Sequence, residues 1–170
     1  MKSQLILLTI FFSAFFSKST VLAQQTEVPI SFQIAIIKQI MIADREIKSS
    51  SNGMVLIVND ANTLKKAELM ANTFRKQGIK AEVTSDLSAY KGKSINVIYF
   101  MSDTIIKPAF IKEEKILTVV ANSQLTEDGH ISISIRKTKG GRPEIVVNRN
   151  VIENEGHGSL ISSLPKAVIL

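Results

Sequence analysis

Histidine side chains are the groups best suited to acid or base chemistry near neutral pH, and this chain has two of them. His130 directly follows a glycine, which is typical of a turn residue. His157 lies in the run Gly-His-Gly-Ser at residues 156–159, where a glycine-flanked serine stands beside a histidine, as in hydrolase loops. The order G-x-S-x-G is missing, and so is a strand leading into a sharp turn before the serine. We therefore predict that residues 156–159 form a flexible connection without nucleophilic chemistry.

A phosphate-binding loop is excluded by spacing. The run Gly-Lys-Ser at residues 92–94 matches the end of such a loop, but Leu87 stands where the first glycine is required. The order of elements is also wrong, because a predicted strand follows the run instead of preceding it.

Metal ligands are equally sparse. The two histidines are far apart in the sequence, and neither has a second imidazole near the acidic residues that flank it. We predict no metal site, no cofactor and no catalytic residue.

Polar residues follow three predicted strands at the edge where ligands bind in open parallel sheets. Asp60 and Asn62 follow the first strand, Asp103 follows the second and Asn122 follows the third. These four side chains form the candidate ligand site. The alternative that stays open is that each of them only caps a helix or a turn.

Three nearly continuous apolar runs predict the strands that carry these residues. They lie at residues 54–59, 95–100 and 116–121, and this pattern is typical of parallel strands that are covered on both faces. Helical spacing of apolar residues predicts an amphipathic helix at residues 29–44 and another between Thr63 and Gly78. A short strand at residues 79–83 and a brief helix at residues 107–112 complete this half of the chain.

The pattern changes after residue 130. Isoleucines alternate strictly with Ser132, Ser134 and Arg136, which predicts an antiparallel strand on the edge side of the sheet with one polar face. A turn at residues 138–141 leads to a partner strand at residues 144–148. For residues 151–170 two arrangements stay open: a helix that begins near Ser162, or an irregular apolar tail packed on the sheet.

Buried strands that alternate with helices, followed by a hairpin, define the fold class. We predict a three-layer α/β sandwich with a mostly parallel sheet and an antiparallel edge hairpin.

The first 23 residues have the features of a secretory signal peptide. Lys2 provides the basic start, residues 5–16 form a short apolar run, and Val21 and Ala23 stand before the expected cleavage site. The run is shorter than the ~20 residues that span a bilayer, so we expect no stable membrane insertion after cleavage. Residues 24–170 then form one exported domain, and loss of the two leader lysines lowers the formal net charge from +6.

Composition excludes further classes of protein. The chain has no cysteine, so neither disulfides nor thiol switching contribute. Its densest basic cluster is Arg136, Lys137, Lys139 and Arg142, around one turn, and no aromatic residues are interleaved there for base stacking. We therefore predict that it does not bind nucleic acid.

Several short motifs of residues 24–170 resemble the YfiR family of exported bacterial proteins. The run GGRPEIVVN at residues 140–148, then Gly156 and the run Ser-Ser-Leu at residues 162–164, resemble that family's closing pattern. Residues 38–47 are similar to a subgroup in which an aspartate-arginine pair, here Asp44 and Arg45, ends the first helix. Pro165 departs from the family's uninterrupted final helix. We expect the pair to matter for structure more than for chemistry.

The resemblance implies a non-enzymatic periplasmic regulator that contacts the periplasmic domain of a membrane sensor protein. The family's namesake restrains a membrane diguanylate cyclase and thereby cyclic-di-GMP signalling, although its redox-sensitive cysteines have no counterpart in this chain. The alternative function is a periplasmic small-ligand-binding protein that uses the polar residues at the strand ends. Whether the chain forms a homodimer stays open.

Overall fold

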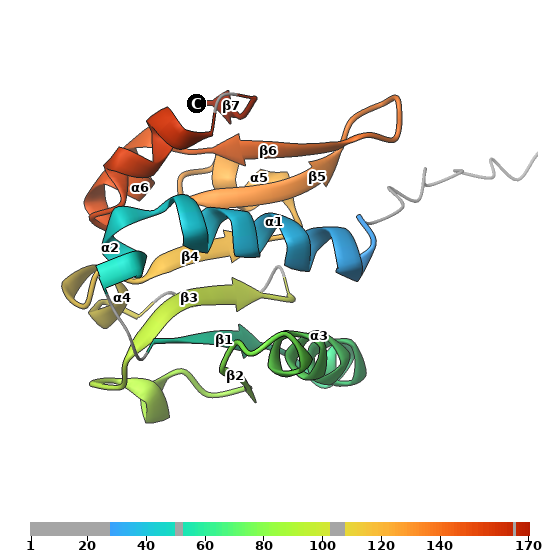
Figure 1. Cartoon of the computed structure of the whole chain (residues 1–170), viewed down its shortest axis with the longest axis vertical. Helices are drawn as coiled ribbons and strands as arrows, with labels where there is room; N and C mark the ends of the chain where they lie inside the picture. The colour runs from blue at the N-terminus through green and yellow to red at the C-terminus, as the bar shows by residue number, and fades with distance from the viewer. Residues whose placement is uncertain (1–27, 50–52, 103–107, 165) are drawn as a thin grey trace, which may run out of the picture.

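The computed structural model describes residues 28–49, 53–102, 108–164 and 166–170. Seven strands form one sheet in the order β2-β1-β3-β4-β5-β6-β7, and helices pack against it (Figure 1). The strands are β1 (Met54–Val58), β2 (Ala81–Thr84), β3 (Ile95–Phe100), β4 (Leu117–Val120), β5 (Ile133–Lys137), β6 (Pro143–Val147) and β7 (Val168–Ile169). The helices are α1 (Ile30–Ala43), α2 (Arg45–Ser49), α3 (Leu64–Lys76), α4 (Phe110–Glu113), α5 (Ser123–Glu127) and α6 (Arg149–Asn154), with 3-10 helices η1 (Ser88–Tyr90) and η2 (Gly158–Ser163).

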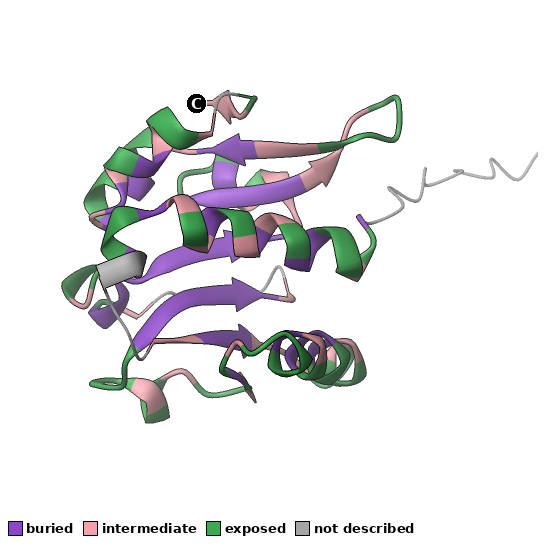
Figure 2. Ribbon diagram, viewed as in Figure 1, coloured by how far each residue is buried: buried purple, intermediate pink, exposed green. Residues whose placement is uncertain are grey.

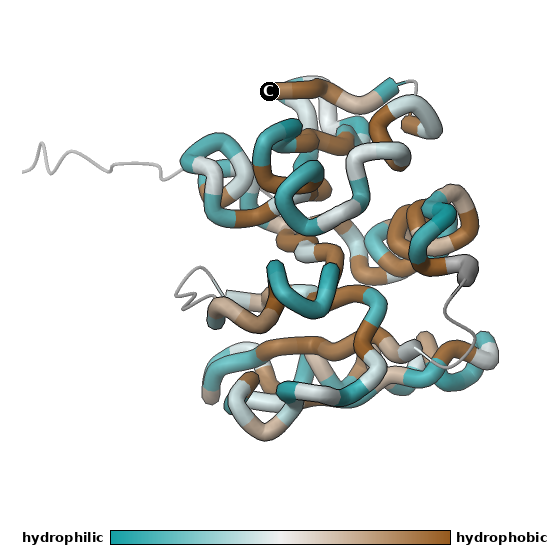
Figure 3. The backbone as a smooth tube through the Cα atoms, turned by 90° about the vertical axis from the view of Figure 1, so that its left-hand side faces the viewer, coloured by the Kyte–Doolittle hydropathy of each residue, from teal (hydrophilic) through white to brown (hydrophobic). Residues whose placement is uncertain are grey.

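The sheet is mostly parallel, as predicted. Strands β2, β1, β3, β4 and β5 run in the same direction, and β5 and β6 form an antiparallel hairpin. All residues of β3 and β4 are buried, because helices and turns cover both faces of these strands. Alternate side chains enter two separate apolar clusters: Val97 and Tyr99 pack with α1 and α3, while Ile98 and Phe100 pack with α4. Figure 3 shows hydrophobic residues concentrated along the strands.

Helix α1 lies across one face of the sheet (Figure 1). Its inner side buries Ile34, Ile37 and Ile40, together with the polar residue Gln33. The Gln33 amide is satisfied there, because the Tyr99 hydroxyl donates to its Oε1 and its Nε2 donates to a backbone carbonyl at 2.6 Å. A buried amide whose nitrogen and oxygen are both hydrogen-bonded fixes the position of α1 on β3 more specifically than apolar contact alone.

The antiparallel hairpin predicted on the edge side of the sheet is confirmed, but its first strand has no solvent-facing polar side. Strand β5 lies inside the sheet, between β4 and β6, and Ser132 and Ser134 are buried. Alternation of apolar and polar residues indicates a solvent-facing side only where no other group covers that side. Here the Ser132 hydroxyl bonds to a buried carboxylate, so the polar character of this position serves the interior.

Neither arrangement considered for residues 151–170 is correct. The segment forms α6, whose first turn is capped by Asn148, then η2 and the short strand β7. Strand β7 pairs in parallel with β6, so the end of the chain supplies an edge strand of the sheet. The strand has only two residues, too few for hydrophobic periodicity to reveal it.

The brief helix expected at residues 107–112 is α4, which begins and ends slightly later at Phe110–Glu113. The predicted signal peptide, residues 1–23, lies outside the described residues, as does Asp103. Among the helices of the described part of the chain, none has the length and apolar character needed to cross a bilayer.

Candidate functional site

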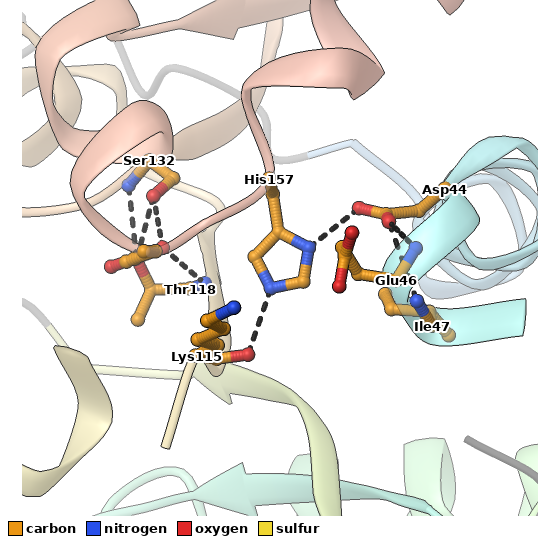
Figure 4. A network of polar contacts seen from close by, with 8 residues as sticks. Asp44, Glu46, Ile47, Lys115, Thr118, Ser132 and His157 are labelled. Atoms are coloured by element: carbon orange, nitrogen blue, oxygen red, sulfur yellow. Dashed lines mark hydrogen bonds and ion pairs between the residues drawn. The ribbon is translucent and has the colours of Figure 1, made fainter. Parts of the chain in front are cut away.

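His157 is a buried titratable side chain of the closing segment, and both of its ring nitrogens are hydrogen-bonded. Nδ1 lies 2.7 Å from the Asp44 carboxylate oxygen Oδ2, and Nε2 lies 2.9 Å from the backbone carbonyl oxygen of Lys115 (Figure 4). His157 and Asp44 are both buried. The ring therefore joins three segments that are far apart in the sequence.

The partners determine the charge of the ring. A backbone carbonyl only accepts hydrogen bonds, so Nε2 carries a proton and donates it to Lys115. Nδ1 donates to the Asp44 carboxylate, which makes the ring an imidazolium. Burial works against this charge, but the Asp44 carboxylate and the Lys115 carbonyl outweigh it and raise the pKa of His157 above its ordinary value.

The second oxygen of Asp44 has a structural task of its own. Oδ1 accepts from the backbone N–H groups of Glu46, at 2.8 Å, and Ile47, at 3.3 Å. Asp44 thus caps the first turn of α2 while its other oxygen holds His157. Arg45, the other member of the predicted pair, is exposed. The pair does not act as a unit, and the partner of the aspartate is a histidine 113 residues away.

A second buried carboxylate lies just before this histidine. Glu155 accepts from the Thr118 backbone N–H at 3.0 Å, from the Thr118 hydroxyl at 2.8 Å and from the Ser132 hydroxyl. These donors sit on β4 and directly before β5, so Glu155 ties the closing segment to the middle of the sheet. Its charge also contributes to the raised pKa of His157.

The prediction that residues 156–159 form a flexible connection was wrong. Gly156 has φ +87° and packs tightly on Lys115: a Cβ at Gly156 would lie 3.1 Å from the Lys115 side chain. The glycines therefore permit close packing and a left-handed backbone, and they do not indicate flexibility here. Local spacing could not reveal this, because both polar partners of His157 come from distant segments. In the described part of the chain, the His157 ring bonds to Asp44 and Lys115. It makes no bond to Ser159.

The predicted ligand site at the strand ends contains two side chains with local bonds. Asp60 Oδ1 accepts from the backbone N–H of Asn62 at 2.8 Å and from the backbone and hydroxyl of Thr63, both at 2.9 Å. The Thr63 and Ser102 hydroxyls lower the pKa of Asp60, so this carboxylate connects the ends of β1 and β3. Asn122 caps α5 by accepting from the Gln124 N–H at 2.9 Å.

The other two predicted ligand residues are Asn62 and Asp103. Asn62 is exposed, and Asp103 lies outside the described residues. In the part of the chain that the structure describes, no group of three or more histidine and acidic side chains is placed to hold a metal ion.

A cavity that the sequence did not suggest lies at the opposite edge of the sheet, where β3 and β4 begin. Its volume is about 220 Å³. Its walls come from α2, from the turn before β3, from the end of α4 and from the closing segment. The lining residues are Glu46, Ile47, Lys93, Ser94, Ile95, Asn96, Glu114, Lys115 and His157. The run Gly-Lys-Ser at residues 92–94 contributes to it, although not as a phosphate-binding loop.

Comparison with known proteins gives no further assignment: the chain matches no protein-family model, and no curated protein matches it. The resemblance to the YfiR family therefore stays a prediction from the motifs of the sequence.

Replacing Asp44 with alanine should unfold the protein much more easily, because the change leaves the His157 charge buried and removes the cap of α2. Breaking a buried pair in this way costs about 3–5 kcal/mol. Urea denaturation monitored by circular dichroism measures the loss. Arg45→Ala is the matched control, since its exposed side chain should change the free energy of unfolding by less than ~0.5 kcal/mol. A similar small effect for Asp44→Ala would contradict the structural role of the pair.

Stability should fall as the pH rises above neutrality. The folded-state pKa of His157 is raised above the unfolded value of about 6.5, so its contribution is complete below that pH. The contribution is lost as the pH rises through the folded-state pKa. The free energy of unfolding, measured from pH 6 upward, should show this loss in the parent and in His130→Gln, but not in His157→Gln. An NMR titration of the native His157 ring that gives a pKa below about 6.5 would exclude the mechanism.

Two buried serines, Ser132 directly before β5 and Ser134 within it, should respond differently to alanine. Ser132→Ala removes a donor from the buried Glu155 carboxylate and should cost about 1.5–3 kcal/mol. Ser134 is equally buried, but its hydroxyl has no hydrogen-bond partner among the described residues, so Ser134→Ala should be neutral or stabilising. Parallel urea titrations of the two variants test the difference. Equal losses would show that the Glu155 network does not contribute to stability.

Proposed function

We propose that this chain is an exported, non-enzymatic regulatory protein that binds the periplasmic domain of a membrane sensor protein. The proposal joins the secretory leader predicted at residues 1–23 with the resemblance to the YfiR family, whose namesake restrains a membrane diguanylate cyclase. The observation that carries the binding role is the outer side of α1.

Helix α1 exposes two large apolar side chains on the side that the sheet does not cover. Phe32 is 54% exposed and Ile42 is 60% exposed, and Figure 2 shows exposed positions along α1 between the buried ones. Ala35 and Gln39 lie between them on this outer side, and Lys38 is the helix's single charged residue. Exposed apolar side chains grouped in this way favour contact with another protein.

The state of His157 supports a role without catalysis. A general base needs a ring nitrogen that is free to reach a substrate proton. Both nitrogens of His157 are engaged in bonds within the fold, and the ring is enclosed. The side chain best suited to acid or base chemistry is thus committed to structure.

The alternative function, ligand binding at the strand ends, is less favoured because its side chains are also engaged in bonds within the fold. Asp60 and Asn122 direct their oxygens to backbone N–H groups at the starts of the helices that follow them. These contacts match the capping role that was the open alternative for them.

Crosslinking in the native envelope tests the proposal. The mature chain should capture an integral membrane protein that has a domain outside the cytoplasm, and mass spectrometry identifies it. The double variant Phe32→Asp with Ile42→Asp should lose most of this capture, because it places charge on the outer side of α1. Its melting temperature should stay close to that of the parent, since both side chains are exposed.

Leu69→Asp is the matched control, because Leu69 is 57% exposed but lies on α3. It should capture the same protein as the parent. Equal capture by the double variant would exclude the outer side of α1 as the contact surface. Absence of any membrane protein among the captured species would overturn the proposed function.

A further inference from the structure

The cavity at the start of β3 and β4 contains two polar groups that the fold itself does not use. Asn96 is only 8% exposed and lines the cavity, yet among the described residues its amide has no hydrogen-bond partner. Lys115 lines the same cavity; it is an exposed residue, and its ammonium likewise has no partner in the described part of the chain. An amide that has no partner within the fold is satisfied by water or by a molecule that enters the cavity.

Lys115 occupies a backbone conformation that favours glycine. Among the described residues other than glycine, Lys115 alone has a positive φ, which is +51°. It occupies the left-handed position just after α4. The Ile116 N–H bonds back to the Ile111 carbonyl at 2.9 Å, which closes this helix end. Strained residues of this kind cluster at binding sites, where the position of the side chain matters more than local stability.

The surroundings hold the Lys115 side chain in place. Its carbonyl accepts from His157, and its aliphatic stem packs against Gly156. Across the cavity, Glu114 Oε1 accepts from the Gly92 N–H at 2.9 Å, which fixes the turn that carries Lys93. A site whose walls are already held in position loses little entropy when a ligand enters.

Asn96 is positioned by a glycine. A Cβ at Gly53 would lie 1.9 Å from the Asn96 amide oxygen, so only glycine at residue 53 allows this amide to occupy its place. The structure therefore gives space to an amide that forms no internal bond, at a point that faces the cavity.

We infer that this cavity binds a small organic carboxylate, with the Lys115 ammonium and the Asn96 amide N–H donating to its two oxygens. The volume of about 220 Å³ lies below the roughly 300–1,000 Å³ of sites for drug-sized ligands, so the ligand is a small molecule.

The charge of the walls selects a single negative charge. Lys93, Lys115 and the His157 imidazolium line the cavity together with Glu46 and Glu114, so three positive and two negative groups leave one net positive charge, which a single carboxylate balances and a dianion exceeds. The Asn96 amide oxygen accepts a hydrogen bond as well, so a carboxylate with a neighbouring hydroxyl satisfies the amide fully. A 2-hydroxy acid should therefore bind more tightly than a simple acid. This site is independent of the contact surface on α1.

Titration with sodium lactate, sodium acetate and sodium phosphate, at constant ionic strength and pH 7.5, tests the inference. Two-dimensional NMR follows the side-chain N–H₂ signals of Asn96 and the backbone signal of Lys115. Lactate should shift both signals saturably, acetate should bind several-fold more weakly, and phosphate should be weakest. Unmoved signals with lactate would overturn the site, and tighter binding of phosphate would overturn the assignment to a carboxylate.

Three variants separate binding from folding. Lys115→Met should weaken lactate binding at least tenfold. Lys112→Met, which changes another exposed lysine three residues earlier on α4, should bind as the parent does. Lys115→Gly should raise the melting temperature, because glycine suits the positive φ, and should still lose binding. Parent-like affinity in either Lys115 variant would show that this ammonium does not hold the ligand.

Discussion

The hydrogen-bonded pair of His157 and Asp44 is the interaction on which the arrangement of this fold depends most. It connects the junction of α1 and α2 to the closing segment, and through the Lys115 carbonyl it also reaches the start of β4. Burying two charges is expensive, so such a pair adds little net stability compared with a well-packed apolar contact. Its effect is on specificity, because any arrangement that separates the two residues leaves a buried charge without a partner. The pair thus selects one placement of α1 and of the closing segment.

Contacts next to the pair also fix the closing segment and Lys115 in place. Glu155, two residues before the histidine, binds donors on β4 and before β5, so the closing segment is fixed at two points. Gly156 lies between these points and brings the segment close to Lys115. The left-handed backbone of Lys115 is then supported from outside by the His157 bond, which explains how a lysine is tolerated where helices usually end in glycine.

The sequence predicted well the features that depend on local patterns. The helix expected at residues 29–44 is α1 at Ile30–Ala43, and the run at residues 95–100 is β3 with the same bounds. Continuous apolar runs predicted parallel strands correctly because a strand that is covered on both faces must be apolar on both. The sequence failed where a polar residue has a distant partner. Ser132 and His157 have the local patterns of a solvent-facing strand and a flexible loop, and only Glu155 and Asp44 explain why both are buried.

The same reasoning explains why the candidate ligand site changed edges of the sheet. At the carboxyl ends of the strands, Asp60 and Asn122 stand directly before helices, where backbone N–H groups without helical partners compete for their oxygens. At the opposite edge, Asn96 lies near the start of β3, at the point where the register with β1 shifts, and its side chain has no helix end to cap. A polar side chain at a strand end is therefore a weak sign of binding. A buried amide within a strand is a stronger one, because nothing local can satisfy it.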